Sequence, residues 1–167
     1  MNSKIDQAAL NKILYINDSI TRKGRLETAQ VFNDKVFDIS IDAKYQDLSY
    51  LVFNNCTLDG IDFTAADLTR CVFNNCSMLQ TDFNHCIMDE VKIIGCIMDG
   101  ADLSNIKSTK LVMMRTAFKS VSWKDSAIDL LCTTPQTRDE SLSQFKQAKV
   151  KRIIVANDPE ARIIRVN

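Results

Sequence analysis

Cysteines recur in this chain at an interval that could assemble a metal site. Cys56, Cys76 and Cys96 are each 20 residues apart, and thiolates are ligands of zinc. A tetrahedral zinc site needs four ligands that converge on one point, whereas equally spaced side chains in a stacked fold lie parallel. Parallel stacking is also a poor orientation for a disulfide. We therefore interpret these cysteines as reduced, small apolar core residues, and we predict no metal and no cofactor.

The residues needed for catalysis are sparse. His85 is the only histidine, so the sequence offers no catalytic triad beyond chance combinations. Gly60, Gly95 and Gly100 occur singly rather than in a phosphate-binding loop, and each falls where a turn tolerates a glycine. We therefore predict that the protein is not an enzyme.

Aspartates repeat with the same interval as the cysteines. Asp62, Asp82 and Asp102 would form one outward column, and Asp59 and Asp99 would flank the same corner. Carboxylates stacked about 4.8 Å apart repel by roughly 1 kcal/mol per pair even in water. One interpretation is that each carboxylate binds the amides of a turn. The other is that these five residues form a surface for a basic partner.

Charge is balanced over the whole chain but not along it. The 167 residues include 21 basic and 21 acidic side chains, which gives no general attraction to nucleic acid or to an anionic membrane. Residues 48–104 hold eight acidic and two basic side chains, whereas residues 105–128 hold one acidic and five basic. Any electrostatic recognition must therefore be local.

Large apolar residues recur every five positions through the middle of the chain. A set of smaller residues lies two positions before them, and the other three positions are mostly polar. A period of five fits neither an amphipathic helix, at about 3.6, nor a half-buried strand, at about 2. It fits a short extended segment followed by a corner. Because Val52–Cys56 recurs as Val72–Cys76, the sequence predicts four such sides per 20-residue coil.

Two segments carry the full pattern of a known family. Ala66–Arg70 and Ala101–Asn105 each combine a small residue, an aspartate, a leucine and two variable positions, and they resemble the motif of pentapeptide-repeat proteins. The resemblance implies a mainly β fold, a right-handed quadrilateral β-helix, over residues 48–128, which corresponds to about four coils. Ser108 breaks the pattern at an inward position. We expect a bulge, a bonded serine or a local loop there.

The flanks are expected to cap the open strand edges at the two ends of the rod. Residues 1–47 are predicted to form an N-terminal cap, with a helix of about Asp6–Tyr15 and a strand-like lead-in over Val31–Ile41. This cap would be followed directly by the repeats.

Residues 129–167 are predicted to form a C-terminal cap. A capping-box pattern predicts a helix of about Asp139–Lys149, and Arg152–Val155 with Arg162–Val166 predicts a hairpin. The alternative role of this region is a homodimer contact, because some pentapeptide-repeat proteins associate through the end of the rod.

These features predict a non-catalytic scaffold that binds a protein partner of unknown identity, without direct nucleic-acid binding. The sequence has neither a run of about 18 apolar residues nor a recognisable secretory signal, so we expect no membrane span and a bacterial cytoplasmic location. The resemblance implies two alternatives. Some family members mimic DNA and act on DNA gyrase, giving protection against fluoroquinolones, and others are effectors secreted into host cells.

Overall fold

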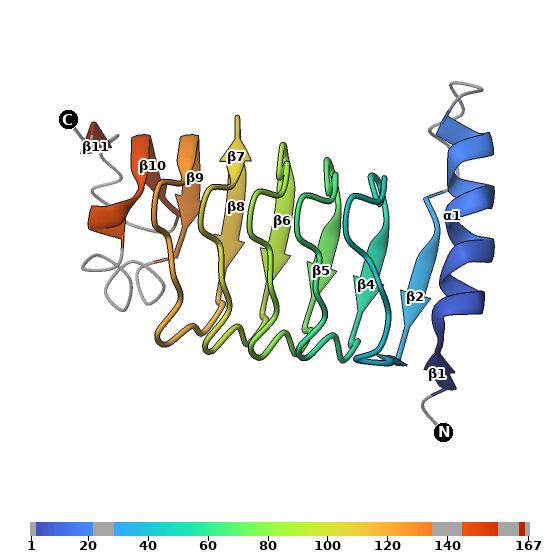
Figure 1. Cartoon of the computed structure of the whole chain (residues 1–167). Coiled ribbons are helices and arrows are strands. Elements are labelled where there is room, and N and C mark those ends of the chain that lie inside the picture. Colours follow the sequence, from blue (N-terminus) through green and yellow to red (C-terminus); the bar gives the residue numbers. More distant parts are fainter. Residues whose placement is uncertain (1–2, 22–28, 135–144, 157–163, 166–167) are drawn as a thin grey trace.

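The computed structural model describes residues 3–21, 29–134, 145–156 and 164–165. These residues form a rod of stacked coils, with helix α1 (Gln7–Thr21) at one end and strands β9, β10 and β11 at the other (Figure 1). A nine-stranded sheet runs along the rod in the order β11-β10-β9-β8-β6-β5-β4-β2, and β7, from the neighbouring side, pairs with the start of β9. The predicted mainly β, quadrilateral fold is confirmed.

The strands of this sheet are short and lie in register. They are β2 (Val31–Asn33), β4 (Val52–Asn54), β5 (Val72–Asn74), β6 (Val91–Ile94), β7 (Lys107–Ser108), β8 (Leu111–Met114), β9 (Ala127–Thr133), β10 (Lys149–Val155) and β11 (Ile164–Arg165). All pairings are parallel except that of β10 with β11. Each parallel pairing stacks one coil on the next.

The four sides of a coil are separated by corners in which one residue adopts a left-handed conformation. Within residues 45–125, all of which the structure describes, every fifth residue has a φ of between 51° and 73°, with Lys110 as the exception. Few of these residues are glycine, although a side chain in this conformation costs about 1 kcal/mol. We number the sides by one coil: side 1 is residues 52–54, side 2 is 57–59, side 3 is 62–64 and side 4 is 67–69.

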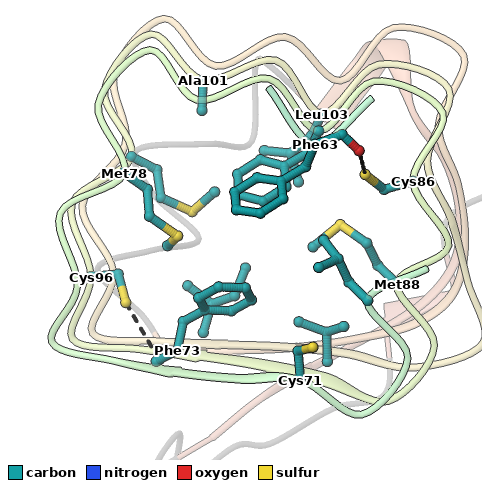
Figure 2. Close-up of a cluster of buried hydrophobic side chains, with 14 of the residues drawn as sticks. Phe63, Cys71, Phe73, Met78, Cys86, Met88, Cys96, Ala101 and Leu103 are labelled. Atoms are coloured by element: carbon teal, nitrogen blue, oxygen red, sulfur yellow. Dashed lines mark hydrogen bonds between the residues drawn. The ribbon is translucent and has the colours of Figure 1, made fainter. Parts of the chain in front are cut away.

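The interior of the rod is filled by the two inward positions of each repeat. Figure 2 shows Phe73, Met78, Phe63 and Met88 pointing into it from sides 1 to 4. Identical side chains in successive coils stack: the rings of Phe53 and Phe73 are 4.9 Å apart and nearly parallel, at 4°. The predicted inward set is therefore the core, and Phe73, Phe83, Met78 and Met88 have no exposed surface.

The rod has about six coils, more than the four predicted. Strand β2 already pairs with β4, and Asp42 and Asp47 bridge to Asp62 and Asp67, so a coil precedes residue 48. At the other end, β9 continues past residue 128 and β10 stacks on it. The predicted strand-like lead-in over Val31–Ile41 is part of this first coil.

The N-terminal end is closed by three elements. The predicted helix is present as α1, which extends beyond the predicted end at Tyr15 and places Leu10 against the core. Strand β1 (Ser3–Ile5) pairs with β3 (Lys35–Phe37) and closes the edge of side 2. On side 3, the amide of Gln7 takes the place of a missing strand: its Oε1 accepts a hydrogen bond from the Asp42 N–H at 2.7 Å and its Nε2 donates to the Asp42 carbonyl at 3.4 Å.

Replacing Gln7 with alanine is expected to open this edge locally. Loss of the two hydrogen bonds should lower the opening free energy of the Asp42 amide by about 1 kcal/mol, which makes its hydrogen exchange roughly fivefold faster. Exchange measured by NMR or mass spectrometry tests this. Lys12→Ala, an exposed change on the same helix, should leave the Asp42 rate unchanged, and an equal effect of the two changes would contradict the capping role.

The predicted break at Ser108 is a bonded serine. Its hydroxyl is buried and donates to the Met88 carbonyl at 2.8 Å. At the next corner, Lys110 lacks the left-handed conformation found at the same corner in earlier coils. In the following coil β9 runs straight through this corner as a seven-residue strand. The square outline therefore opens from this point towards the C-terminus.

The C-terminal region differs in part from its prediction. The described end of the predicted helix is a 3-10 turn, η1 (Phe145–Gln147), and β10 begins at Lys149, so the helix does not reach that residue. The reason is that Lys149 and Val150 continue the parallel ladder on β9. The predicted hairpin is confirmed where it is described, because Ile153 pairs with Ile164 in antiparallel register. Residues 135–144, which hold the predicted helix start, lie outside the described residues.

Candidate partner surface

The five aspartates predicted as a partner surface lie around one corner of the rod. Asp62, Asp82 and Asp102 are bridged in register along side 3. Asp59 and Asp99 lie on side 2, two coils apart, and Leu79 occupies the equivalent position in the coil between them. The corner that joins the two groups consists of residues 60, 80 and 100, two of which are glycine.

On side 3 each carboxylate holds its own turn. The Oδ1 atoms of Asp62, Asp82 and Asp102 accept backbone N–H bonds, at 2.8 to 2.9 Å, from the residue two positions later. Partial burial acts to raise the pKa of Asp62, but hydrogen bonds from Thr64 and Lys44 outweigh it, so this pKa lies below its ordinary value. Each of the three carboxylates thus has one oxygen fixed by the backbone.

On side 2 the carboxylates connect successive coils instead. Asp59 Oδ1 accepts from the Leu79 N–H at 2.8 Å and from the Ser77 hydroxyl at 2.7 Å. Asp99 Oδ1 accepts from the Lys119 N–H at 2.8 Å. In every predicted aspartate, one carboxylate oxygen therefore accepts a backbone N–H, as the turn-amide interpretation expects. That interpretation does not assign a role to the second oxygen.

Apolar side chains lie beside these carboxylates, which the sequence reasoning missed. Ile39, Leu79 and Ile97 are 70%, 38% and 49% exposed. Ile39 projects because the first coil has one extra residue: Val36 bridges to Thr57, 21 positions on, whereas Asp42 bridges to Asp62, 20 positions on. The available signal was an apolar residue at the outward positions 79 and 97, where the repeat is usually polar.

The inward cysteines are buried thiols held by backbone carbonyls. Cys86 donates to the Phe63 carbonyl at 2.9 Å (Figure 2). Cys71 donates to the Leu48 carbonyl, also at 2.9 Å. Burial raises the pKa of Cys86 to about 12 and that of Cys71 well above its ordinary value. Among the described residues no group of three or more His, Cys, Asp or Glu side chains is arranged to hold a metal ion.

We expect one fast-reacting thiol in the native protein and six after unfolding. Cys132 is part-exposed, whereas the other five cysteines are buried and most of their thiolates are disfavoured. Cys96 separates the effect of burial from that of pKa. A hydrogen bond from Cys76 lowers its pKa, but its side chain is buried, so we expect it to react slowly. Titration with a chromogenic disulfide reagent gives the count, and Cys132→Ser should reduce the fast phase to zero. More than one fast thiol would show that the core opens readily.

Basic side chains appear towards the C-terminal end of the same sides. Lys119 follows Asp99 on side 2, and Lys124 lies in the coil after Ser104 on side 3. Near the N-terminal end, the ammonium of Lys44 pairs with Asp62 Oδ2 at 2.9 Å. The acidic stretch therefore ends before the last coils, and Lys44 offsets part of its charge at the N-terminal end.

Comparison with known proteins decides the family. The model of pentapeptide repeats matches residues 47–78 and 66–105, with eight copies of the repeat. The chain is a pentapeptide-repeat protein. A solved structure of a pentapeptide repeat protein from the thylakoid lumen of Arabidopsis thaliana is 20% identical and covers 73% of this chain and 85% of that one. The TM-score between the two structures is 0.28.

Two further findings concern curated proteins and membrane-spanning helices. No curated protein matches the chain. Within the described residues, no helix is both long enough and apolar enough to cross a membrane.

Proposed function

We propose that this pentapeptide-repeat protein is a non-catalytic scaffold that binds a protein partner through the corner between sides 2 and 3. The observation that carries the proposal is the fixed geometry of the aspartates: each has one oxygen tied to a backbone amide, so the array is held in place before a partner arrives. Pre-organisation reduces the entropy lost on binding.

The alternative of a DNA mimic is less well supported by the charges. Side 3 repeats one carboxylate per coil, about every 4.8 Å, whereas duplex DNA carries one charge per roughly 1.7 Å. Lys44 also pairs with Asp62. A gyrase supercoiling assay with the purified protein addresses this alternative: we expect no change in supercoiling and no protection against a fluoroquinolone.

The scaffold proposal is tested by photo-crosslinking in the cells from which the gene comes. A photoreactive amino acid is placed on each side in turn, at Val112, Ala117, Asn84 or Thr69 for sides 1 to 4. We expect a discrete product from Ala117 or Asn84, containing a protein identified by mass spectrometry that binds the purified scaffold again. Absence of a product from all four positions would refute a scaffold function.

A further inference from the structure

Side 2 carries a diagonal strip of exposed apolar side chains, formed by Ile39, Leu79 and Ile97. Single exposed apolar residues need no explanation, but a group of them indicates an interaction surface. Ile39 reaches over the neighbouring coil, since its Cδ1 is 2.7 Å from where a Cβ of Gly60 would lie. Leu79 and Ile97 belong to the third and fourth coils. The strip therefore extends over four successive coils, with Ile39 of the first coil covering the second.

The glycine at residue 60 is what allows Ile39 to occupy this place. Gly60 is in the left-handed corner position with φ of 68°, and any side chain there would displace Ile39. The position of Ile39, the first member of the strip, thus depends on two features: the extra residue in the first coil and the absence of a side chain at Gly60 in the second.

The strip is bordered by negative charge. Asp59 and Asp99 lie on the same side at the second and fourth coils, and Asp82 lies across the corner. One oxygen of Asp59 and one of Asp99 are used by backbone amides, which leaves the other oxygen of each for a partner. The first basic residue that follows on this side is Lys119. A partner that covers the strip must therefore bring basic groups beside its apolar ones.

The spacing of the strip fits a helix. The end of the Ile39 side chain lies over Gly60 in the second coil. From there to Leu79, and from Leu79 to Ile97, the separation is one coil, about 4.8 Å, and one or two residues across the strand at about 3.3 Å each. Apolar residues four apart on a helix are about 6 Å apart along its axis. Residues i, i+4 and i+8 of an amphipathic helix can thus meet Ile39, Leu79 and Ile97 in turn.

We propose that side 2 docks a basic amphipathic α-helix of a partner protein, with the helix's apolar stripe on Ile39, Leu79 and Ile97 and its lysines or arginines on Asp59 and Asp99. The inference rests on the scaffold function and adds the side and the chemistry of the partner. It follows the helix-in-groove mode of recognition, in which apolar anchors set the position and charges set the specificity.

The chain contains its own matched control. Residues 87–89 and 97–99 have the same sequence, Ile-Met-Asp. Ile87 is 42% exposed on side 4, and Asp89 accepts the Thr109 N–H at 2.7 Å just as Asp99 accepts that of Lys119. Ile87, however, bridges to Asp67 on one side and Lys107 on the other, so no apolar strip surrounds it.

The test is a titration of the full chain with a labelled model peptide of about four helical turns, made of leucine and lysine in a helical pattern. The controls are a scrambled peptide of the same composition and a peptide with glutamate in place of lysine. Binding is measured by fluorescence anisotropy at two salt concentrations, and helix formation by circular dichroism.

We expect the helical basic peptide to bind and the two control peptides to bind at least tenfold more weakly. Ile97→Ser should lower the affinity about tenfold and Asp99→Asn about threefold, whereas Ile87→Ser and Asp89→Asn should leave it unchanged. Equal effects of the matched changes would overturn the proposal, as would binding that is independent of the peptide's pattern. Light scattering that showed a second copy of the chain occupying side 2 would also overturn it.

The crosslinking experiment separates this inference from the proposed function. A product from Ala117, on side 2, that is lost in the Ile97→Ser variant supports the helix-docking site. A product from Asn84 alone would leave the scaffold function standing and overturn the docking site on side 2.

Discussion

Replacing Phe73 with alanine is expected to lower the free energy of unfolding by about 4 kcal/mol. Phe73 has no exposed surface, stacks on Phe53 and meets the edge of Phe83 at 6.4 Å between ring centres. Its backbone is held in the parallel ladder between Phe53 and Ile93. Because both neighbouring coils are fixed by hydrogen bonds, the core cannot collapse into the space left behind, and the cavity adds to the lost burial.

Urea denaturation followed by the fluorescence of Trp123, the only tryptophan, measures this loss. The control is Val72→Ala, on the same strand but directed outward and half-buried, which should cost less than about 1 kcal/mol. Similar losses from the two changes would mean that the interior is not close-packed at this coil.

The inward positions of the middle coils could be predicted from sequence because one rule governs all of them. Each inward residue stacks on its equivalent 20 positions away, so the same residue types recur, as in Phe53 and Phe73. The same rule marked Ser108 as an exception with three possible outcomes, a bulge, a bonded serine or a local loop, and the structure shows the bonded serine.

The first coil was missed because it departs from this rule in two places. The extra residue between Val36 and Asp42 shifts the phase of the repeat. Ala43, which is fully buried, replaces the large residue expected five positions before Leu48. Counting back in steps of five from Leu48 therefore gives an alanine and then Asp38, so the sequence pattern stops although the chain continues to coil.

The candidate surface was predicted only in part, for a related reason. The repeat identifies the outward columns, so the acidic column on side 3 could be found from spacing. The apolar strip on side 2 depends on Ile39, whose position is set by the shifted first coil and by the absence of a side chain at Gly60. Counting residues in steps of five cannot reveal a contact between two coils when one of them contains an extra residue.

The aromatic cluster at the C-terminal end also lay beyond the sequence pattern, because it joins the last repeats to a segment outside them. Trp123 is fully buried between Phe118, at 6.1 Å between ring centres, and Phe145 of η1, at 4.8 Å. Phe145 is itself 7% exposed. These three rings close the open end of the interior and attach the C-terminal strands to the rod.

Trp123→Ala is therefore expected to cost about 4 kcal/mol of unfolding free energy, whereas Trp123→Phe should change it by no more than about 1 kcal/mol. The indole Nε1 is buried and has no hydrogen-bond partner among the described residues. An unpaired buried donor costs about 1 to 3 kcal/mol, so removing it offsets the burial lost with the smaller ring. Both variants lack the fluorophore, so unfolding is followed by far-ultraviolet circular dichroism. If the phenylalanine variant were as unstable as the alanine variant, the N–H would have to contribute a bond that holds the cap in place.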